Sequence, residues 1–265
     1  MEQRHEEIAD ALFMQHRDKQ RFRPLASEQR SDDLDAAYRI QEFLQERFVA
    51  EGYGEIAGYK VALTSVAMQE FVGVDQPLAG AIFANSVHTS PVALDLKAFQ
   101  HLGIECEIAV RLSSNLPGRV GGHDAGSVGP SIGAVMPAFE LIEDRNADYD
   151  AIDAFSLVAD NSWNGGIVLG AATDNWQALD LLSLPGTLQM NGKEIGSGKG
   201  ADALGNPLSA VAWLADLQAD RGHILKRGMI VMTGSVVPTH FPAPGESLVF
   251  SLGDLGTVDL SLDSG

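Results

Sequence analysis

The sequence has little cysteine, little positive charge and no long apolar run. Its only cysteine is Cys106, so a disulfide within the chain and a zinc site built from several cysteines are both excluded. Lysine and arginine number 18 against 36 acidic residues, and a net charge of −18 repels nucleic-acid phosphates and anionic membranes. No apolar run approaches the roughly 20 residues that span a bilayer, and residues 1–10 lack the apolar core of a signal peptide. We therefore expect a cytoplasmic protein that binds neither nucleic acid nor membrane.

The first quarter of the chain has a helical pattern. Residues 2–22 are rich in Glu, Gln, Ala and Arg, most of which favour helices. A second helix is expected to begin at Ser31, a good capping residue, and to end at Gly52. These two helices predict an N-terminal helical segment over residues 1–55.

The rest of the chain has the sequence pattern of a β-rich domain, which we predict over residues 56–265. The sequence contains 28 glycines and 11 prolines, and in this part they separate short apolar runs as turns separate strands. Asn191 and Gly192 predict a tight hairpin. One helix is expected between Pro207 and Gly222, because proline suits the first helical position and glycine often follows the last. The expected strands are residues 56–63, 104–112, 166–171, 186–190, 229–234, 247–251 and 256–261.

Residues 104–112, IECEIAVRL, alternate with a period of two. On a strand, Glu105 and Glu107 share one face, about 6.6 Å apart at Cα, and apolar side chains occupy the other. Repulsion between the two carboxylates is about 0.6 kcal/mol in water and about 2.5 kcal/mol at an effective dielectric constant of about 20. On a solvated face the pair needs no explanation, whereas in a cleft it requires a cation. The spacing alone leaves both interpretations open.

A third acidic position lies in the segment MPAFELIEDR. Glu140 is flanked by apolar residues, whereas Glu143 and Asp144 have the pattern of ordinary surface charge. A carboxylate among apolar residues is costly unless it is paired, protonated or bound to a metal. One interpretation is a buried ion pair, for example with Arg145. The other is a metal site, since three glutamate side chains without cysteine suit a hard cation such as Mg²⁺ or Mn²⁺.

Several other residues are candidates for a binding site. Lys60, in GYKVALTS, can act as a base or bind a carboxylate near a cation, or it can face solvent from a strand. Asn161 and Ser162, in ADNSWNGGIVLG, can bond to a ligand or simply form a turn. His101 is the histidine nearest to the glutamate pair, and we expect it to pack rather than bind metal. The glycine-rich residues 113–130 predict either an active-site lid or a surface insertion.

Six segments carry a resemblance to a known family. They are GYKVALTS, VGVDQPLAGAIF, GIECEIAV, MPAFELIEDR, ADNSWNGGIVLG and ALGNPLSAVAWLADL. In this order they resemble the 2-oxopent-4-enoate (2-keto-4-pentenoate) hydratase and 4-oxalocrotonate decarboxylase family, within the fumarylacetoacetate hydrolase superfamily. The likeness extends from about residue 31 to about residue 250. It implies an α+β fold, namely a mixed β-sandwich or roll of the fumarylacetoacetate hydrolase C-terminal type with N-terminal helices, usually assembled as a homo-oligomer.

The resemblance also implies a site and a reaction. The substrate would be a small anionic 2-oxo acid, and the activity a metal-assisted ketonisation and hydration of a 2-hydroxydienoate in aromatic catabolism. Leu78 follows the DQP tripeptide, on the substrate side, where several hydratases carry an acid, and this departure puts hydration in doubt. The implied metal ligands for Mg²⁺ or Mn²⁺ are Glu105, Glu107 and Glu140, and the implied substrate-side residues are Lys60, also catalytic, Leu78 and Ser162.

Three alternatives remain open from the sequence. The first is a metal-dependent 2-oxo acid decarboxylase of the 4-oxalocrotonate type. The second is an acylpyruvate-type C–C hydrolase, which needs a water-activating pair such as His–Glu, and no such pair is evident. The third is a non-enzymatic binding module stabilised by a cation.

Overall fold

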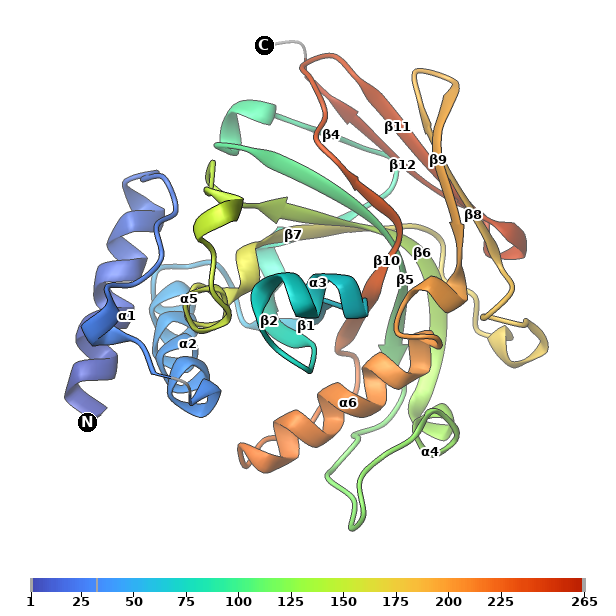
Figure 1. Ribbon diagram of the computed structural model, residues 1–265. Helices are drawn as coiled ribbons and strands as arrows, with labels where there is room; N and C mark the ends of the chain where they lie inside the picture. The colour runs from blue at the N-terminus through green and yellow to red at the C-terminus, as the bar shows by residue number, and fades with distance from the viewer. Residues whose placement is uncertain (1, 32, 264–265) are drawn as a thin grey trace.

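A computed structural model describes residues 2–31 and 33–263 (Figure 1). Among these residues, no helix combines the length and the apolarity needed to cross a membrane. The helices are α1 (Glu2–Arg17), α2 (Leu34–Ala50), α3 (Val66–Val72), α4 (Ala125–Val128), α5 (Ala154–Ala159) and α6 (Pro207–Asp220). The strands are β1 (Ile56–Ala62), β2 (Leu78–Phe83), β3 (Val87–Thr89), β4 (Val92–Leu94), β5 (Leu102–Leu112), β6 (Ile132–Glu143), β7 (Asn164–Leu169), β8 (Pro185–Met190), β9 (Lys193–Lys199), β10 (Ile230–His240), β11 (Ser247–Leu252) and β12 (Thr257–Leu262).

Two mixed sheets form the body. The larger has the strand order β2-β1-β10-β5-β6-β7-β3, and the smaller has the order β4-β12-β11-β8-β9. They pack face to face, and Phe139 of β6 meets Phe250 of β11 with ring centroids 6.3 Å apart. In Figure 1 the smaller sheet lies on one side of the larger, and α1 and α2 lie on the opposite side. The predicted mixed β-sandwich with N-terminal helices is confirmed.

The larger sheet curls around a small apolar cluster of its own. Buried residues that belong to this sheet alone contact one another on its second face, away from the main core. They include Ile82, Ala109, Ala138 and Met232, from four different strands. The strands β2 and β7 stand five places apart in the strand order, yet they contact each other. A flat sheet would hold them apart, so this face is concave. The cluster fills the concavity at its own level. The same face continues with the side chains two and four residues before Ala109 on β5 and two residues after Ala138 on β6.

The N-terminal helices differ in detail from the prediction. The first ends at Arg17, five residues before the predicted end, and Lys19 then takes a positive φ of 48°. The second begins at Leu34, and its capping residue is Asp33 rather than Ser31, because the Asp33 side chain accepts a hydrogen bond from the Asp35 backbone N–H at 2.9 Å. Both helices bury their apolar stripe in the same continuous core as the sheets.

The longest strand, β6, was not predicted from the sequence. Ten of its 12 residues are buried, so it has no polar face and no alternation to detect. It also contains Pro137, which normally argues against an interior strand because it lacks an N–H donor. The predicted hairpin and the predicted late helix are confirmed. Asn191 and Gly192 take φ values of 50° and 78°, and α6 begins at Pro207.

Candidate metal centre

Three glutamates meet on the concave face of the larger sheet. Glu105 of β5 lies directly opposite Glu140 of β6, and Glu107 follows two residues later on the same face of β5. One carboxylate oxygen from each of the three lies within 4.8 Å of the others. The period-two pair and the glutamate in the apolar run are therefore brought together, although they are 33 to 35 positions apart in the sequence.

The triad is buried and incompletely hydrogen-bonded. Glu107 and Glu140 have no exposed surface, and Glu105 is half-buried. Glu107 Oε2 accepts a hydrogen bond from the Gly234 backbone N–H at 2.8 Å, and the Thr239 hydroxyl donates to Glu105 Oε1 at 2.6 Å. Among the described residues, Glu107 Oε1 and Glu140 Oε2 have no hydrogen-bond partner. Buried carboxylate oxygens without donors are costly, so this donor set fits a cation.

Lys60 is part of the same group. Its Nζ lies 3.1 Å from Glu140 Oε1, and its side chain is only 4% exposed. A solvent-facing position on the strand is therefore wrong for Lys60. The ion-pair interpretation of Glu140 is right in kind but wrong in partner, because Arg145 instead pairs with Asp160 at 3.0 Å. Three carboxylates against one ammonium leave two negative charges, which a divalent cation would balance.

The buried charges shift one another's pKa values. Burial raises the pKa of Glu107 well above its ordinary value, and the charges of Glu140 and Glu105 raise it further. Burial also raises the pKa of Glu140, although Lys60 opposes this. Burial alone would lower the pKa of Lys60, but Glu140 and Glu105 outweigh it and raise that pKa. Lys60 therefore stays an ammonium beside the carboxylates, which suits binding of an anionic group better than action as a base.

A strained turn places Ser162 near this group. Asn161, Ser162 and Trp163 all have positive φ, at 60°, 50° and 56°, a conformation that side chains rarely adopt. The Ser162 hydroxyl donates a hydrogen bond to the Ala79 carbonyl at 2.9 Å. Its oxygen can still accept a hydrogen bond from a ligand.

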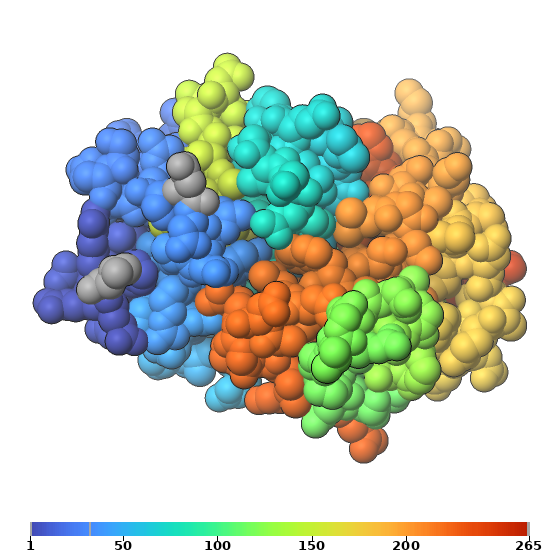
Figure 2. Space-filling model, turned by 60° about the horizontal axis from the view of Figure 1, so that its bottom comes forward, coloured from blue at the N-terminus to red at the C-terminus, as the bar shows by residue number. Residues whose placement is uncertain are grey.

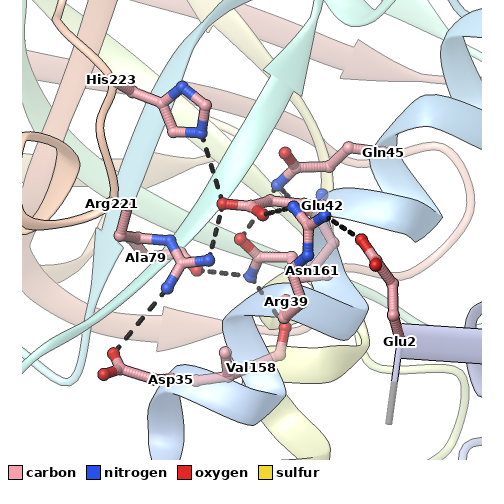
Figure 3. A network of polar contacts seen from close by, with 11 residues as sticks. Glu2, Asp35, Arg39, Glu42, Gln45, Ala79, Val158, Asn161, Arg221 and His223 are labelled. Atoms are coloured by element: carbon pink, nitrogen blue, oxygen red, sulfur yellow. Dashed lines mark hydrogen bonds and ion pairs between the residues drawn. The ribbon is translucent and has the colours of Figure 1, made fainter. Parts of the chain in front are cut away.

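Contacts from β2 and α2 hold the turn in this conformation. The Asn161 side chain bonds to both backbone groups of Ala81, at 2.8 and 2.9 Å. Gln45 of α2 donates to Asn161 Oδ1 at 3.2 Å, as Figure 3 shows. A Cβ at Gly80 would lie 2.4 Å from the Asn161 carbonyl oxygen, so only glycine allows this close approach. Since Gly80 lies opposite Lys60 on β1, the turn is fixed against the strand that carries the lysine.

A cavity of about 610 Å³ opens beside the triad. Its wall combines apolar side chains such as Leu63 and Trp163 with Lys60, Glu105 and Ser162. A larger and more open cavity of about 1020 Å³ lies near the start of α2 and contains none of the predicted site residues. Because the charged and strained groups lie at the smaller cavity, we take that one as the candidate site.

Two predicted components lie elsewhere. Leu78 has no exposed surface and is not part of the cavity wall, although Ala62, its cross-strand neighbour, is. Leu78 therefore packs behind the wall. No residue of 113–130 lines the cavity either. This segment lies against α6, where the His123 backbone N–H donates to Asp216 at 2.9 Å, and Figure 2 shows the two side by side in green and orange. It is a surface insertion here, and the lid interpretation is not supported.

The sequence analysis missed one set of polar residues near the cavity. Asp144, which was expected to be surface charge, has no exposed surface. It contacts His101 at 2.8 Å and accepts a hydrogen bond from the Tyr149 hydroxyl at 3.0 Å. Its burial follows from the end of β6, an unpredicted strand, so no local pattern reveals it. The expectation that His101 packs is confirmed, because its ring stacks on Phe241.

The curled sheet of the β-sandwich thus carries three convergent glutamates as a candidate metal centre, and comparison with known proteins shows the family to which such a chain belongs. The chain belongs to the fumarylacetoacetate hydrolase family, since the family model described as fumarylacetoacetate (FAA) hydrolase C-terminal matches residues 56–262. The resemblance carried by the six segments is thus confirmed.

Individual relatives and solved structures agree with this placement. The 2-keto-4-pentenoate hydratase of Paraburkholderia xenovorans is 30% identical over 262 residues, which cover 99% of this chain and 96% of the relative. The 4-oxalocrotonate decarboxylase of Pseudomonas putida is 33% identical over 222 residues, covering 84% and 83%. The structure of 4-oxalocrotonate decarboxylase from Pseudomonas putida G7, complexed with magnesium and adipate, is similar with a TM-score of 0.92 at 29% identity, covering 99% and 98%.

Proposed function

We propose that the protein is a divalent-metal-dependent lyase that ketonises and hydrates a small 2-hydroxydienoate. Relatives named 2-keto-4-pentenoate hydratase support the hydratase part of this proposal. The observation that carries the proposal is the buried triad, in which three side chains converge within 4.8 Å and two carboxylate oxygens have no donor in the part of the chain that the structure describes. Glu105, Glu107 and Glu140 would hold Mg²⁺ or Mn²⁺. A similar solved decarboxylase contains magnesium, which supports this choice. We further propose a homo-oligomer in the cytoplasm.

The residues around the triad divide the work of binding. When bound, the divalent cation would act as a Lewis acid: it would polarise the 2-oxo group and balance the negative charge that develops on the oxygen of that group. Lys60, held as an ammonium, would bind the substrate carboxylate or enol oxygen and keep it oriented. The Ser162 oxygen, whose own proton is directed to Ala79, would accept a hydrogen bond from the enol hydroxyl. Apolar wall residues such as Leu63 and Trp163 would exclude bulk water.

The charges on the wall favour a substrate with one carboxylate. Among the described residues that line the cavity, Lys60 is the only cation, whereas Glu105 and Asp202 are acidic. A second carboxylate at the far end of a substrate would meet no cation and would approach an acidic wall. A monocarboxylate dienoate suits this cavity better than a dicarboxylate. Decarboxylation of a 4-oxalocrotonate-type diacid remains the second candidate, because relatives with that name are similar over most of the chain.

Substrate preference tests this proposal. With Mn²⁺ or Mg²⁺ present, kcat/KM for 2-hydroxypenta-2,4-dienoate should exceed that for 2-hydroxyhexa-2,4-dienedioate by about 10-fold or more. This ratio corresponds to about 1.4 kcal/mol of repulsion between the second carboxylate of the diacid and the acidic wall. The measurement is loss of the dienol absorbance together with product analysis, with a chelated sample as control. Faster turnover of the diacid, with release of carbon dioxide, would instead establish the decarboxylase.

A further inference from the structure

Three side chains form a continuous path from the surface to the cavity wall. His101 Nδ1 lies 2.8 and 3.0 Å from the two oxygens of Asp144. The Tyr149 hydroxyl donates a hydrogen bond to Asp144 Oδ2 at 3.0 Å. Tyr149 lines the same cavity as Glu105 and Lys60, whereas the His101 side chain is 42% exposed. The path thus connects solvent to the candidate site through a fully buried carboxylate.

The surrounding structure fixes each member. The His101 ring stacks on Phe241 with centroids 4.6 Å apart and an interplanar angle of 16°. Asp144 follows directly after β6, four residues beyond the metal-site position Glu140. The Tyr149 ring meets Trp163 of the strained turn edge to face, with centroids 5.6 Å apart. Among the described residues, these three side chains have no other part in the metal site, so the function proposed above does not explain their arrangement.

Hydration needs a group that takes a proton from the attacking water. Leu78 cannot do this, since it is apolar and fully buried behind the cavity wall. Lys60 is already engaged, since its Nζ lies 3.1 Å from Glu140 Oε1. The Tyr149 hydroxyl differs from both. Its proton is directed to Asp144, so its oxygen can accept a hydrogen bond from a water in the cavity.

We propose that Tyr149 is a catalytic residue for the hydration step, with Asp144 and His101 as positioning residues that act through it. This inference rests on the hydratase function proposed above. The water oxygen would bond to C4 of the 2-oxo-3-enoate while one water O–H bond breaks. The released proton would pass to the Tyr149 oxygen as the phenolic proton moves to Asp144. The C3–C4 electron pair would shift toward the 2-oxo group, and the proton would return through Tyr149 to C3 as the 2-oxo acid re-forms.

The environment suits a relay rather than a charged phenolate. Burial raises the pKa of Tyr149, and the negative charges of Asp144 and Glu105 raise it further. The phenol therefore stays neutral and passes a proton on without holding the negative charge. Asp144 is the fully buried member of the path, and His101, whose side chain is 42% exposed, lies beside it.

The test is Tyr149→Phe, which removes only the hydroxyl group. Dienol loss and hydrated product are measured separately with 2-hydroxypenta-2,4-dienoate and Mn²⁺. The ratio of hydrated to ketonised product should fall about 100-fold, at the lower end of the range for positioned acid–base groups. The effect should lie in kcat rather than KM, and Mn²⁺ affinity should stay at the wild-type value. Tyr53→Phe, at an exposed tyrosine outside this cavity, is the matched control and should leave the ratio unchanged.

A second variant separates a relay from simple packing. Asp144→Asn keeps the shape of the side chain but cannot readily take the proton, so it should lower the same product ratio as Tyr149→Phe does. The proposal is overturned if either variant hydrates at the wild-type ratio, or if both steps are lost in equal measure. If wild type itself yields no hydrated product from the monocarboxylate, the hydratase function fails together with the relay. That outcome is visible in wild type alone and is distinct from a failure confined to the variants.

Discussion

Glu107→Gln is expected to lower metal-dependent turnover about 1000-fold or more, which corresponds to about 4 kcal/mol of lost transition-state stabilisation. The reason is that Glu107 is fully buried, and one of its oxygens has no other partner among the described residues. Glutamine keeps the shape and can still accept the hydrogen bond from Gly234, but it removes the negative charge that a cation requires. Turnover and Mn²⁺ binding are measured on the same preparation.

A thermal denaturation without metal completes this experiment. Because burial and neighbouring carboxylates raise the pKa of Glu107, its ionised form opposes folding near neutral pH, and the neutral glutamine should not lower the unfolding temperature. Glu194→Gln, at an exposed position on β9, is the matched control and should change neither property. A Glu107→Gln protein that binds Mn²⁺ and turns over substrate like wild type would show that Glu107 is not a metal ligand.

Lys60→Met is expected to lower turnover about 1000-fold, within the range for a charged group that contacts a reacting substrate. Methionine roughly preserves the apolar stem, so the change removes mainly the ammonium that lies 3.1 Å from Glu140. Mn²⁺ affinity should be unchanged or higher, because the three carboxylates remain and a competing positive charge is gone. The measurement is kcat and KM with saturating Mn²⁺.

Lys193→Met, at an exposed lysine on β9, is the control for general loss of positive charge. It should have wild-type kinetics, because Lys193 is exposed and does not line the cavity that contains Lys60. Wild-type kinetics in Lys60→Met would show that this lysine only balances the buried charge of Glu140. A loss of both turnover and Mn²⁺ binding would show that Lys60 organises the carboxylates rather than the substrate.

The parts of the site that alternate within one strand could be predicted from the sequence. Glu105 and Glu107 share a face because a strand has a period of two, and this follows from nine consecutive residues. The hairpin at Asn191 and the helix beginning at Pro207 also depend only on local backbone preferences. The six ordered segments then indicated the family, although no single segment carries enough information to do so.

Other features of the site depend on how the sheet curls and could not be predicted from short stretches of sequence. The burial of Lys60 and its pairing with Glu140 require β1 and β6 to approach across the concave face, although β10 and β5 lie between them in the sheet. Asp144 is buried because β6 brings it beneath His101, which comes before β5. The position of Leu78 could not be predicted from the sequence either, because only the structure shows that this side chain lies behind the cavity wall.

The central claim is that three glutamates hold one divalent cation. A crystal structure with Mn²⁺, in which the anomalous signal of the ion is located, tests it most directly. The account predicts a single strong peak on the concave face of the larger sheet, within about 2.3 Å of one carboxylate oxygen each from Glu105, Glu107 and Glu140. A peak elsewhere, or an ion without a bond to Glu107 and Glu140, would contradict it.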